Sequence, residues 1–141
     1  MSPRTCTAGE PPVKKKRIKT SSAKAKGRNL QKLTGEKISI LTGYTFGKDE
    51  MIASREMGQN GTDIRLIADA REAFPWSVEC KAGNSFSFPD AVRQAKANQL
   101  PGTDWLLVTR RDRESALVTI DMDVFFRSEE RRVGKECRSR W

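Results

Sequence analysis

The stretch Trp76-Ser-Val-Glu-Cys-Lys81 decides the fold prediction, because its side chains alternate in character with a period of two. This period is typical of a β-strand whose two faces differ. Val78 and Cys80 fall on the apolar face, whereas Glu79 and Lys81 fall together on the polar face. We therefore expect a strand that buries one face and places a carboxylate beside an ammonium on the other.

Helical and extended patterns flank this strand on both sides. Apolar residues three or four apart predict a helix over residues 26–42, and Pro89 predicts the first turn of a second helix that ends near Leu100. Further strands are predicted at residues 51–57, 63–67, 103–109 and 116–120, with a connection or one helical turn at 68–75 and a final helix from Asp123. The order is a helix, three strands, a helix and two strands.

Length and composition limit the class of protein. The chain has 141 residues, 36% of them hydrophobic, and a net charge of +9, which suits one domain. No apolar run approaches the roughly 20 residues of a membrane span, and because no apolar stretch follows the N-terminal basic residues, we expect no secretory signal. Because the chain has no histidine, it cannot contain a Ser-His pair or histidine-ligated zinc. Three distant cysteines support no disulfide framework, so we expect a reducing cytoplasm.

The positive charge is concentrated at the N-terminus. Residues 1–28 contain nine Lys and Arg residues against Glu10 alone, whereas residues 29–126 contain twelve against fourteen acidic residues. Residues 1–25 carry almost no large apolar side chains, so we expect a disordered basic arm that binds phosphate backbones. The alternatives are a solubilising tail and, for Lys14-Lys15-Lys16-Arg17, a nuclear import signal.

The last fifteen residues, Arg127 to Trp141, show no apolar periodicity and no capping signal. At every position they resemble the in-frame translation of a short-read sequencing adapter. We therefore expect residues 127–141 to be an artefact without function, and the natural protein to continue differently after Phe126. The alternative is a genuine basic tail.

Asp63 and Glu79 form the candidate chemical site. Asp63 begins one predicted strand, and a hairpin-like connection would bring that start near Glu79 on the next strand. Two converging carboxylates suit Mg²⁺, and a neighbouring lysine, Lys81, would orient a water or stabilise charge on a phosphate. The pattern predicts metal-assisted hydrolysis of a phosphodiester. The alternative is that Glu79 and Lys81 form an ordinary solvated strand face.

The same residues belong to a wider resemblance. Residues 26–126 resemble the PD-(D/E)xK nuclease superfamily, and within it the small phage enzymes similar to archaeal Holliday-junction resolvases. The stretches that match are Lys26-Gly-Arg-Asn-Leu-Gln31, Ser54-Arg-Glu-Met-Gly-Gln-Asn-Gly-Thr-Asp63, Phe74-Pro-Trp-Ser-Val-Glu-Cys-Lys81, and Gln94 with Asn98. The resemblance implies an α/β fold with an αβββαβ restriction-endonuclease-like core, in which helices flank a mixed central sheet.

The resemblance also implies roles for residues of the candidate site. Asp63 and Glu79 would be metal ligands, helped by the Cys80 carbonyl, with Mg²⁺ as the ion and Mn²⁺ able to replace it. Lys81 would be the catalytic lysine, and Gln94 would contact the scissile region or its water network.

The first helix departs from the family pattern. Typical resolvases carry an acid where this chain has Gln31, and Glu36 is the nearby residue that would substitute for it. The resemblance therefore leaves open the number of metal ions and the level of activity.

The function expected from these features is a metal-dependent DNA endonuclease acting on branched or structured DNA in the cytoplasm of a phage-infected or prophage-carrying bacterium. The alternatives are a non-catalytic nucleic-acid-binding module of the same fold and a basic structural or assembly protein. Related resolvases commonly act as symmetric dimers, so a homodimer is an option, although the sequence shows no interface. The residues expected to contact DNA are Lys14, Lys15, Lys16, Arg17, Lys26, Arg28 and Arg55.

Overall fold

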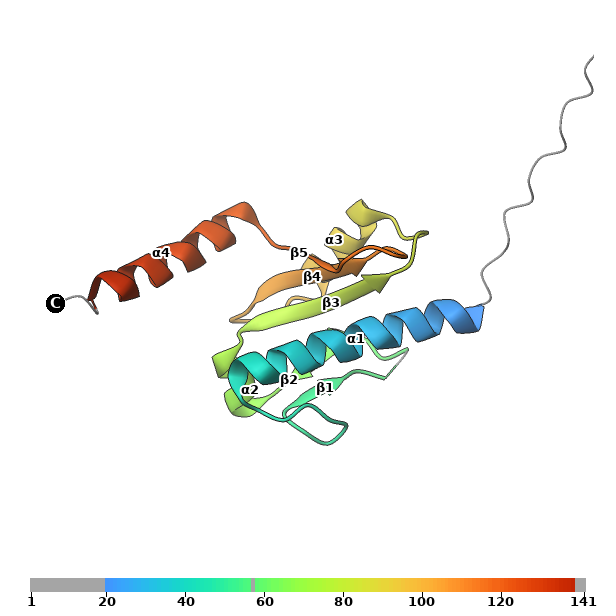
Figure 1. The fold of residues 1–141 in the computed structure, drawn as a ribbon, viewed down its shortest axis with the longest axis horizontal. Helices are drawn as coiled ribbons and strands as arrows, with labels where there is room; N and C mark the ends of the chain where they lie inside the picture. The colour runs from blue at the N-terminus through green and yellow to red at the C-terminus, as the bar shows by residue number, and fades with distance from the viewer. Residues whose placement is uncertain (1–19, 57, 139–141) are drawn as a thin grey trace, which may run out of the picture.

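The structure, a computed structural model, describes residues 20–56 and 58–138. It has a five-stranded sheet with helices against its faces, so the predicted α/β class with a mixed central sheet is confirmed (Figure 1). The elements in chain order are α1 (Thr20–Thr42), β1 (Ile52–Ser54), β2 (Ile64–Leu66), α2 (Ala68–Ala73), β3 (Trp76–Ala82), α3 (Phe88–Ala97), β4 (Asp104–Arg110), β5 (Leu117–Thr119) and α4 (Met122–Arg138).

The strands lie in the order β1-β2-β3-β4-β5 across the sheet. β3 and β4 pair in parallel, from Trp76 opposite Asp104 to Ala82 opposite Arg110, and the other neighbours pair antiparallel. Parallel strands need a crossover, and α3 provides it between β3 and β4. The start of β2 therefore lies beside the middle of β3, as Ile64 opposite Val78 shows.

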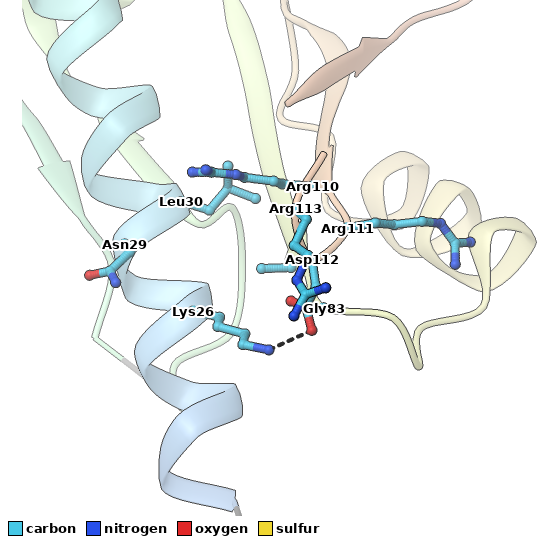
Figure 2. Close-up of a pocket in the computed structure, with 9 residues that line it drawn as sticks. Lys26, Asn29, Leu30, Gly83, Arg110, Arg111, Asp112 and Arg113 are labelled. Atoms are coloured by element: carbon cyan, nitrogen blue, oxygen red, sulfur yellow. Dashed lines mark hydrogen bonds and ion pairs between the residues drawn. The ribbon is translucent and has the colours of Figure 1, made fainter. Parts of the chain in front are cut away.

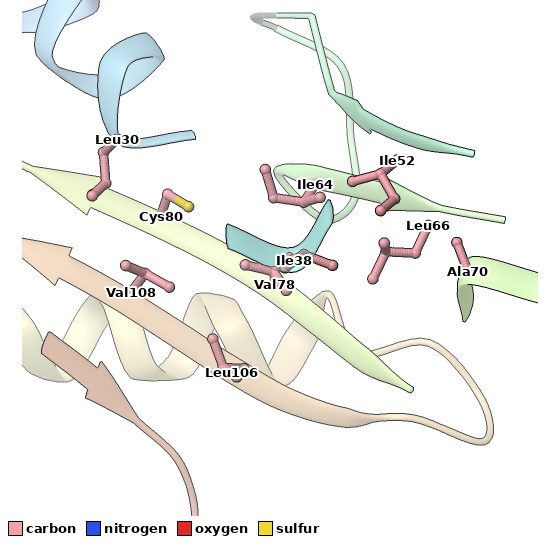
Figure 3. Close-up of a cluster of buried hydrophobic side chains, with 10 residues drawn as sticks. All are labelled: Leu30, Ile38, Ile52, Ile64, Leu66, Ala70, Val78, Cys80, Leu106 and Val108. Carbon is pink, nitrogen blue, oxygen red and sulfur yellow. The ribbon is translucent and has the colours of Figure 1, made fainter. Parts of the chain in front are cut away.

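The larger core lies between α1 and the sheet. It buries apolar side chains from both, and Figure 3 shows Leu30 and Ile38 of α1 facing Val78 and Cys80 of β3. Because each fully buried Leu, Ile or Val side chain contributes about 1.5–3 kcal/mol, this cluster is a main source of stability. The predicted apolar face of the strand at residues 76–81 is therefore confirmed.

The second, smaller core lies between α3 and the opposite face of the sheet. Ala91 and Ala95 of α3 are buried against Trp105 and Leu107 of β4. The helix begins at Phe88 with Pro89 in its first turn, as predicted, and ends at Ala97, three residues before the predicted end. Two alanines on the buried face bring the helix backbone close to the sheet.

Helix α1 begins earlier than predicted. It starts at Thr20 rather than at residue 26, so residues 20–25, which were expected to belong to the basic arm, are helical. Ala and Lys favour helix, which explains the extension beyond the packed part of α1. Gly35 does not interrupt the helix; the ring of Phe46 packs against it, and a β-carbon there would come within 3 Å of three ring atoms.

Helix α4 differs from the expected short helix at the end of the domain. It continues to Arg138, through residues that were expected to lie outside the fold. Figure 1 shows it extending away from the sheet, and nearly all of its side chains between Arg127 and Lys135 are exposed. Within residues 20–56 and 58–138, no helix has the length and apolar character needed to cross a lipid bilayer.

Candidate active site

Asp63 is positioned by the antiparallel pairing of β2 with β3. It immediately precedes β2, and its backbone N–H donates to the Val78 carbonyl at 2.9 Å. Its Oδ2 accepts a 2.7 Å hydrogen bond from the backbone N–H of Cys80. The prediction that the residue before β2, Asp63, lies close to the middle of β3 is therefore confirmed.

Glu79 lies on the face of β3 that α3 covers, and it is only 2% exposed. Its Oε2 accepts from Asn98 Nδ2 at 3.3 Å, and its Oε1 lies 3.4 Å from the ammonium of Lys81. A carboxylate is almost never fully buried unless it is paired. The burial excludes the alternative in which Glu79 is part of a solvated strand face.

The surroundings of both carboxyl groups disfavour the ionised form, so both pKa values are raised. Burial raises the pKa of Glu79, and the nearby charge of Asp63 raises it further, while Asn98 and Lys81 oppose the shift. Burial also raises the pKa of Asp63, against the Cys80 N–H and the charges of Lys81 and Arg55. Two carboxylates that repel each other in a partly desolvated place form a site that favours an additional cation.

A cleft of about 420 Å³ opens onto these groups. It is bounded by α1, the turn before Asp63, β3 and α3. The structure brings together in its lining most of the site residues expected from sequence, namely Arg28, Gln31, Arg55, Asp63, Glu79, Cys80, Lys81 and Gln94.

Three other expectations have different outcomes. Lys26 lies outside this cleft, and its ammonium forms a 2.7 Å ion pair with Asp112. Glu36 does not line the cleft either, and its Oε1 lies 3.8 Å from Lys32 Nζ on the same helix. It therefore does not take the place of the acid that the family pattern has at the position of Gln31. The run Lys14-Lys15-Lys16-Arg17 lies outside the described residues.

Arg55 has a structural role in addition to its place in the cleft. Its Nε donates to the Thr62 carbonyl and its Nη1 to the Asn60 carbonyl, both at 2.7 Å. Gly61, with a φ of 110°, allows the chain to turn sharply beneath this guanidinium. Arg55 thus fixes the loop that delivers Asp63, a role that the sequence pattern did not indicate.

Asn98 is the site residue that matched the family pattern without an assigned role. Its position four residues after Gln94 places both on one helical face, which was the available signal. Only the fold shows that this face meets Glu79.

Cys80 contributes its backbone to the site, while its side chain belongs to the core. Its Sγ donates to Thr34 Oγ1 at 3.8 Å, and burial raises the pKa of the thiol to about 12. The thiol is therefore neutral and takes no part in metal binding. This confirms the prediction of a buried, apolar role for this cysteine.

The groups that could hold a metal ion are the Asp63 and Glu79 carboxylates with the Cys80 carbonyl. Among the described residues, no cluster of three His, Cys, Asp or Glu side chains is present. An all-protein cage is therefore not available in this region. Mg²⁺ usually keeps several waters and binds through one or two carboxylates plus substrate phosphate, so the donor set fits this ion.

Comparison of the chain with protein-family models, with curated proteins and with solved structures finds no match.

Proposed function

We propose that the protein is a metal-dependent DNA endonuclease. The observation that carries the proposal is the meeting of Asp63 with the buried Glu79 in one cleft, with the Lys81 ammonium 3.4 Å from Glu79. Burying a carboxylate beside another carboxylate destabilises a fold, and such arrangements are concentrated at functional sites. Binding a divalent cation against phosphate is the use that this residue set supports best.

Asp63, Glu79 and the Cys80 carbonyl would hold Mg²⁺ or Mn²⁺ at the floor of the cleft. The bound ion would polarise the phosphate and lower the pKa of its water. The fixed Cys80 N–H holds Asp63 in place without a flexible side chain. The Asn98 side-chain amide holds Glu79.

Lys81 would stabilise the negative charge of the phosphate or orient the attacking water. Its side chain is 28% exposed, so the ammonium lies between the buried carboxylate and the open cleft. Gln94 lines the same cleft from α3 and would contact the scissile region. Arg28 of α1 would bind backbone phosphate on the other side.

The substrate proposed is branched or otherwise structured DNA, cut by a homodimer in a phage-infected or prophage-carrying bacterial host. This rests on the resemblance to resolvases, in which two strands must be cut. Gln31 lines the cleft at the place where those enzymes carry an acid, so we propose a lower activity than theirs.

The test is a cleavage assay on four-way junctions, forks, nicked duplexes and linear duplexes of one sequence. Nicking should require Mg²⁺ or Mn²⁺, and Glu79→Gln and Lys81→Ala should each lower the rate by a hundredfold or more. The matched controls are Glu36→Gln and Lys32→Ala, which remove the same charges from α1 outside the cleft. Both should cleave like the unchanged protein.

Binding measured in Ca²⁺ or EDTA separates the rival functions. An endonuclease should keep its DNA affinity in Glu79→Gln. If purified protein binds DNA but no metal supports nicking of any substrate, the protein is a binding module and the proposed activity is wrong. Equal loss of nicking in the Glu36→Gln control would also remove the case for the cleft.

A further inference from the structure

A second, basic pocket lies next to the candidate active site. It has a volume of about 240 Å³, and its walls are α1, the end of β3 and the turn between β4 and β5 (Figure 2). Ala82 lines both this pocket and the catalytic cleft, so the two share a wall at the end of β3. The sequence pattern did not indicate this pocket.

Three arginines of the β4–β5 region, Arg110, Arg111 and Arg113, supply most of its charge. Within residues 20–56 and 58–138, none of the three forms an ion pair with a carboxylate. The only acidic residue in the lining, Asp112, is already paired with Lys26. The pocket therefore carries three positive charges that no carboxylate neutralises, and guanidinium groups match phosphate geometry well.

The frame of the pocket is fixed by hydrogen bonds. Asn84 Oδ1 accepts from the Asp112 N–H at 3.0 Å, and Asn84 Nδ2 donates to the Asp112 carboxylate at 3.3 Å. Figure 2 shows Lys26 reaching from α1 to the same carboxylate. These contacts tie the β4–β5 turn to α1 and to the segment after β3, so Asp112 organises the pocket. Arg110 Nε donates to the Glu114 carbonyl at 3.3 Å and Arg111 Nη1 to the Asn84 carbonyl at 3.5 Å, so backbone oxygens hold these two side chains while no carboxylate in the described residues neutralises their charge.

The backbone of the turn is unusual at Arg113. This residue has a φ of 65°, and the Glu114 N–H closes the turn by donating to the Arg111 carbonyl at 3.2 Å. A glycine or asparagine normally takes such a position. A long cationic side chain at a strained site is an outlier of the kind that accompanies function.

We propose that this pocket binds a backbone phosphate of the DNA strand that passes through the catalytic cleft. The choice of DNA as the ligand rests on the proposed function. Phosphate binding by the pocket does not, however, require that the protein cleave DNA. Because the two pockets share Ala82, a strand with one phosphate at Lys81 can continue along the end of β3 to the arginines. Arg110 and Arg113 then anchor it, while Arg111, which lies over the Phe86 ring at 5.2 Å, supports the wall.

The test compares DNA binding of the full chain and of Arg110→Gln/Arg113→Asn by fluorescence anisotropy in Ca²⁺. Asparagine is chosen because it tolerates the left-handed backbone of residue 113. The affinity should fall about tenfold, and the negative slope of log K against log[salt] should become shallower by about 0.9 for one lost phosphate contact. The matched control is Arg127→Gln/Arg131→Gln, which removes two exposed arginines of α4 that form no ion pair with the part of the chain that the structure describes, and it should change neither value.

A second variant, Arg110→Lys/Arg113→Lys, keeps the charge and should recover most of the salt slope with part of the affinity. If the first variant binds DNA like the control, the pocket proposal is wrong, whatever the cleavage assay shows. If it binds weakly although no metal supports nicking, the pocket stands and the endonuclease proposal fails. Titration with inorganic phosphate gives the last outcome. If phosphate alone saturates the pocket, and Arg110→Gln/Arg113→Asn has unchanged DNA affinity, the pocket binds a free anion and the DNA proposal is wrong.

Discussion

The backbone N–H of Cys80 donates a 2.7 Å hydrogen bond to Oδ2 of Asp63. A main-chain donor cannot change rotamer, so the register between β2 and β3 directly sets the position of this carboxylate. The neighbouring side chain, Glu79, is held by side-chain partners instead. The two carboxylates are thus fixed by different means, and substitutions should affect them differently.

Glu79→Gln should stabilise the protein at pH 7 in EDTA, because it removes a buried charge near Asp63. The pKa of Glu79 is raised in the folded state, so the folded state holds this proton more tightly than the unfolded state. Stability then falls as pH rises above the ordinary value of 4.5 and through the folded pKa. The advantage of the variant should therefore vanish near pH 4. Urea unfolding at pH 7 and at pH 4 measures the difference in free energy of unfolding between the variant and the unchanged protein.

The control for this prediction is Glu36→Gln, which should change stability little at either pH because Glu36 lies on the surface of α1. A Glu79→Gln protein that is less stable than the unchanged chain at pH 7 would mean that Lys81 and Asn98 more than offset the burial of this charge.

Asn98→Ala should destabilise the fold by about 1–3 kcal/mol at pH 7, because it removes a hydrogen bond to a buried carboxylate. It should also raise the pKa of Glu79 further, since Asn98 lowers it. The loss should shrink at pH 4, where Glu79 is protonated. Asn29→Ala, on the exposed side of α1, is the control for chemical denaturation. A pH-independent loss would show that Asn98 acts only by ending α3.

Mg²⁺ or Mn²⁺ should raise the melting temperature of the unchanged protein, because an ion that binds only the folded state stabilises it by mass action. The rise should be a few degrees at a concentration 100 times the dissociation constant. Asp63→Asn and Glu79→Gln should each lose it, and Glu36→Gln should keep it. An equal rise in all four proteins in a thermal-shift series would place the ion elsewhere.

Gly35→Ala should destabilise the protein by about 1–3 kcal/mol, although alanine is the better helix former. The added methyl group would overlap the Phe46 ring. Gly27→Ala is the matched control on the same helix, since nothing lies within 4 Å of its β-carbon position, and it should stabilise by roughly 0.5–1 kcal/mol. Two thermal melts decide the point; a gain at both positions would show that Phe46 moves freely.

Cys80 should resist alkylation in the native protein. Its thiol is buried and its pKa is raised to about 12, so almost no thiolate is present at pH 8. Iodoacetamide should label it at least a hundredfold more slowly in buffer than in urea. Peptide mass spectrometry separates this site from the other cysteines. Rapid native labelling would place the thiol outside the α1 core.

The local parts of the fold could be predicted from sequence because they depend on periodicity. The alternation from Trp76 to Lys81 gave both the strand and its two faces, and Pro89 marked the start of α3. The start of α1 was missed because residues 21–25 are exposed or at most half-buried, so they show no apolar periodicity. Helix propensity decides such a segment, and composition alone pointed to disorder.

The candidate site was only partly predictable. The two-residue period places Glu79 and Cys80 on opposite faces of the strand, but it does not reveal whether another element covers Glu79. That depends on α3 and on Asn98, which caps the end of this helix and lies 19 residues after Glu79 in the sequence. Arg55 was expected to meet phosphate, and the structure shows it bound to the carbonyls of its own loop. The basic pocket joins segments far apart in the chain, so no single stretch signals it.

The two alanines that α3 buries against β4 have a consequence for recognition. Ala91 and Ala95 share a helical face with Gln94 and Asn98, so their methyl groups act as spacers that fix how far those amides stand from the sheet. Adding one or two carbons at Ala91 would push α3 away from β4 and move Gln94 and Asn98 with it. If the proposed endonuclease function holds, the side chains at Ala91 and Ala95 would then set the width left for a DNA strand, although neither residue lines the cleft.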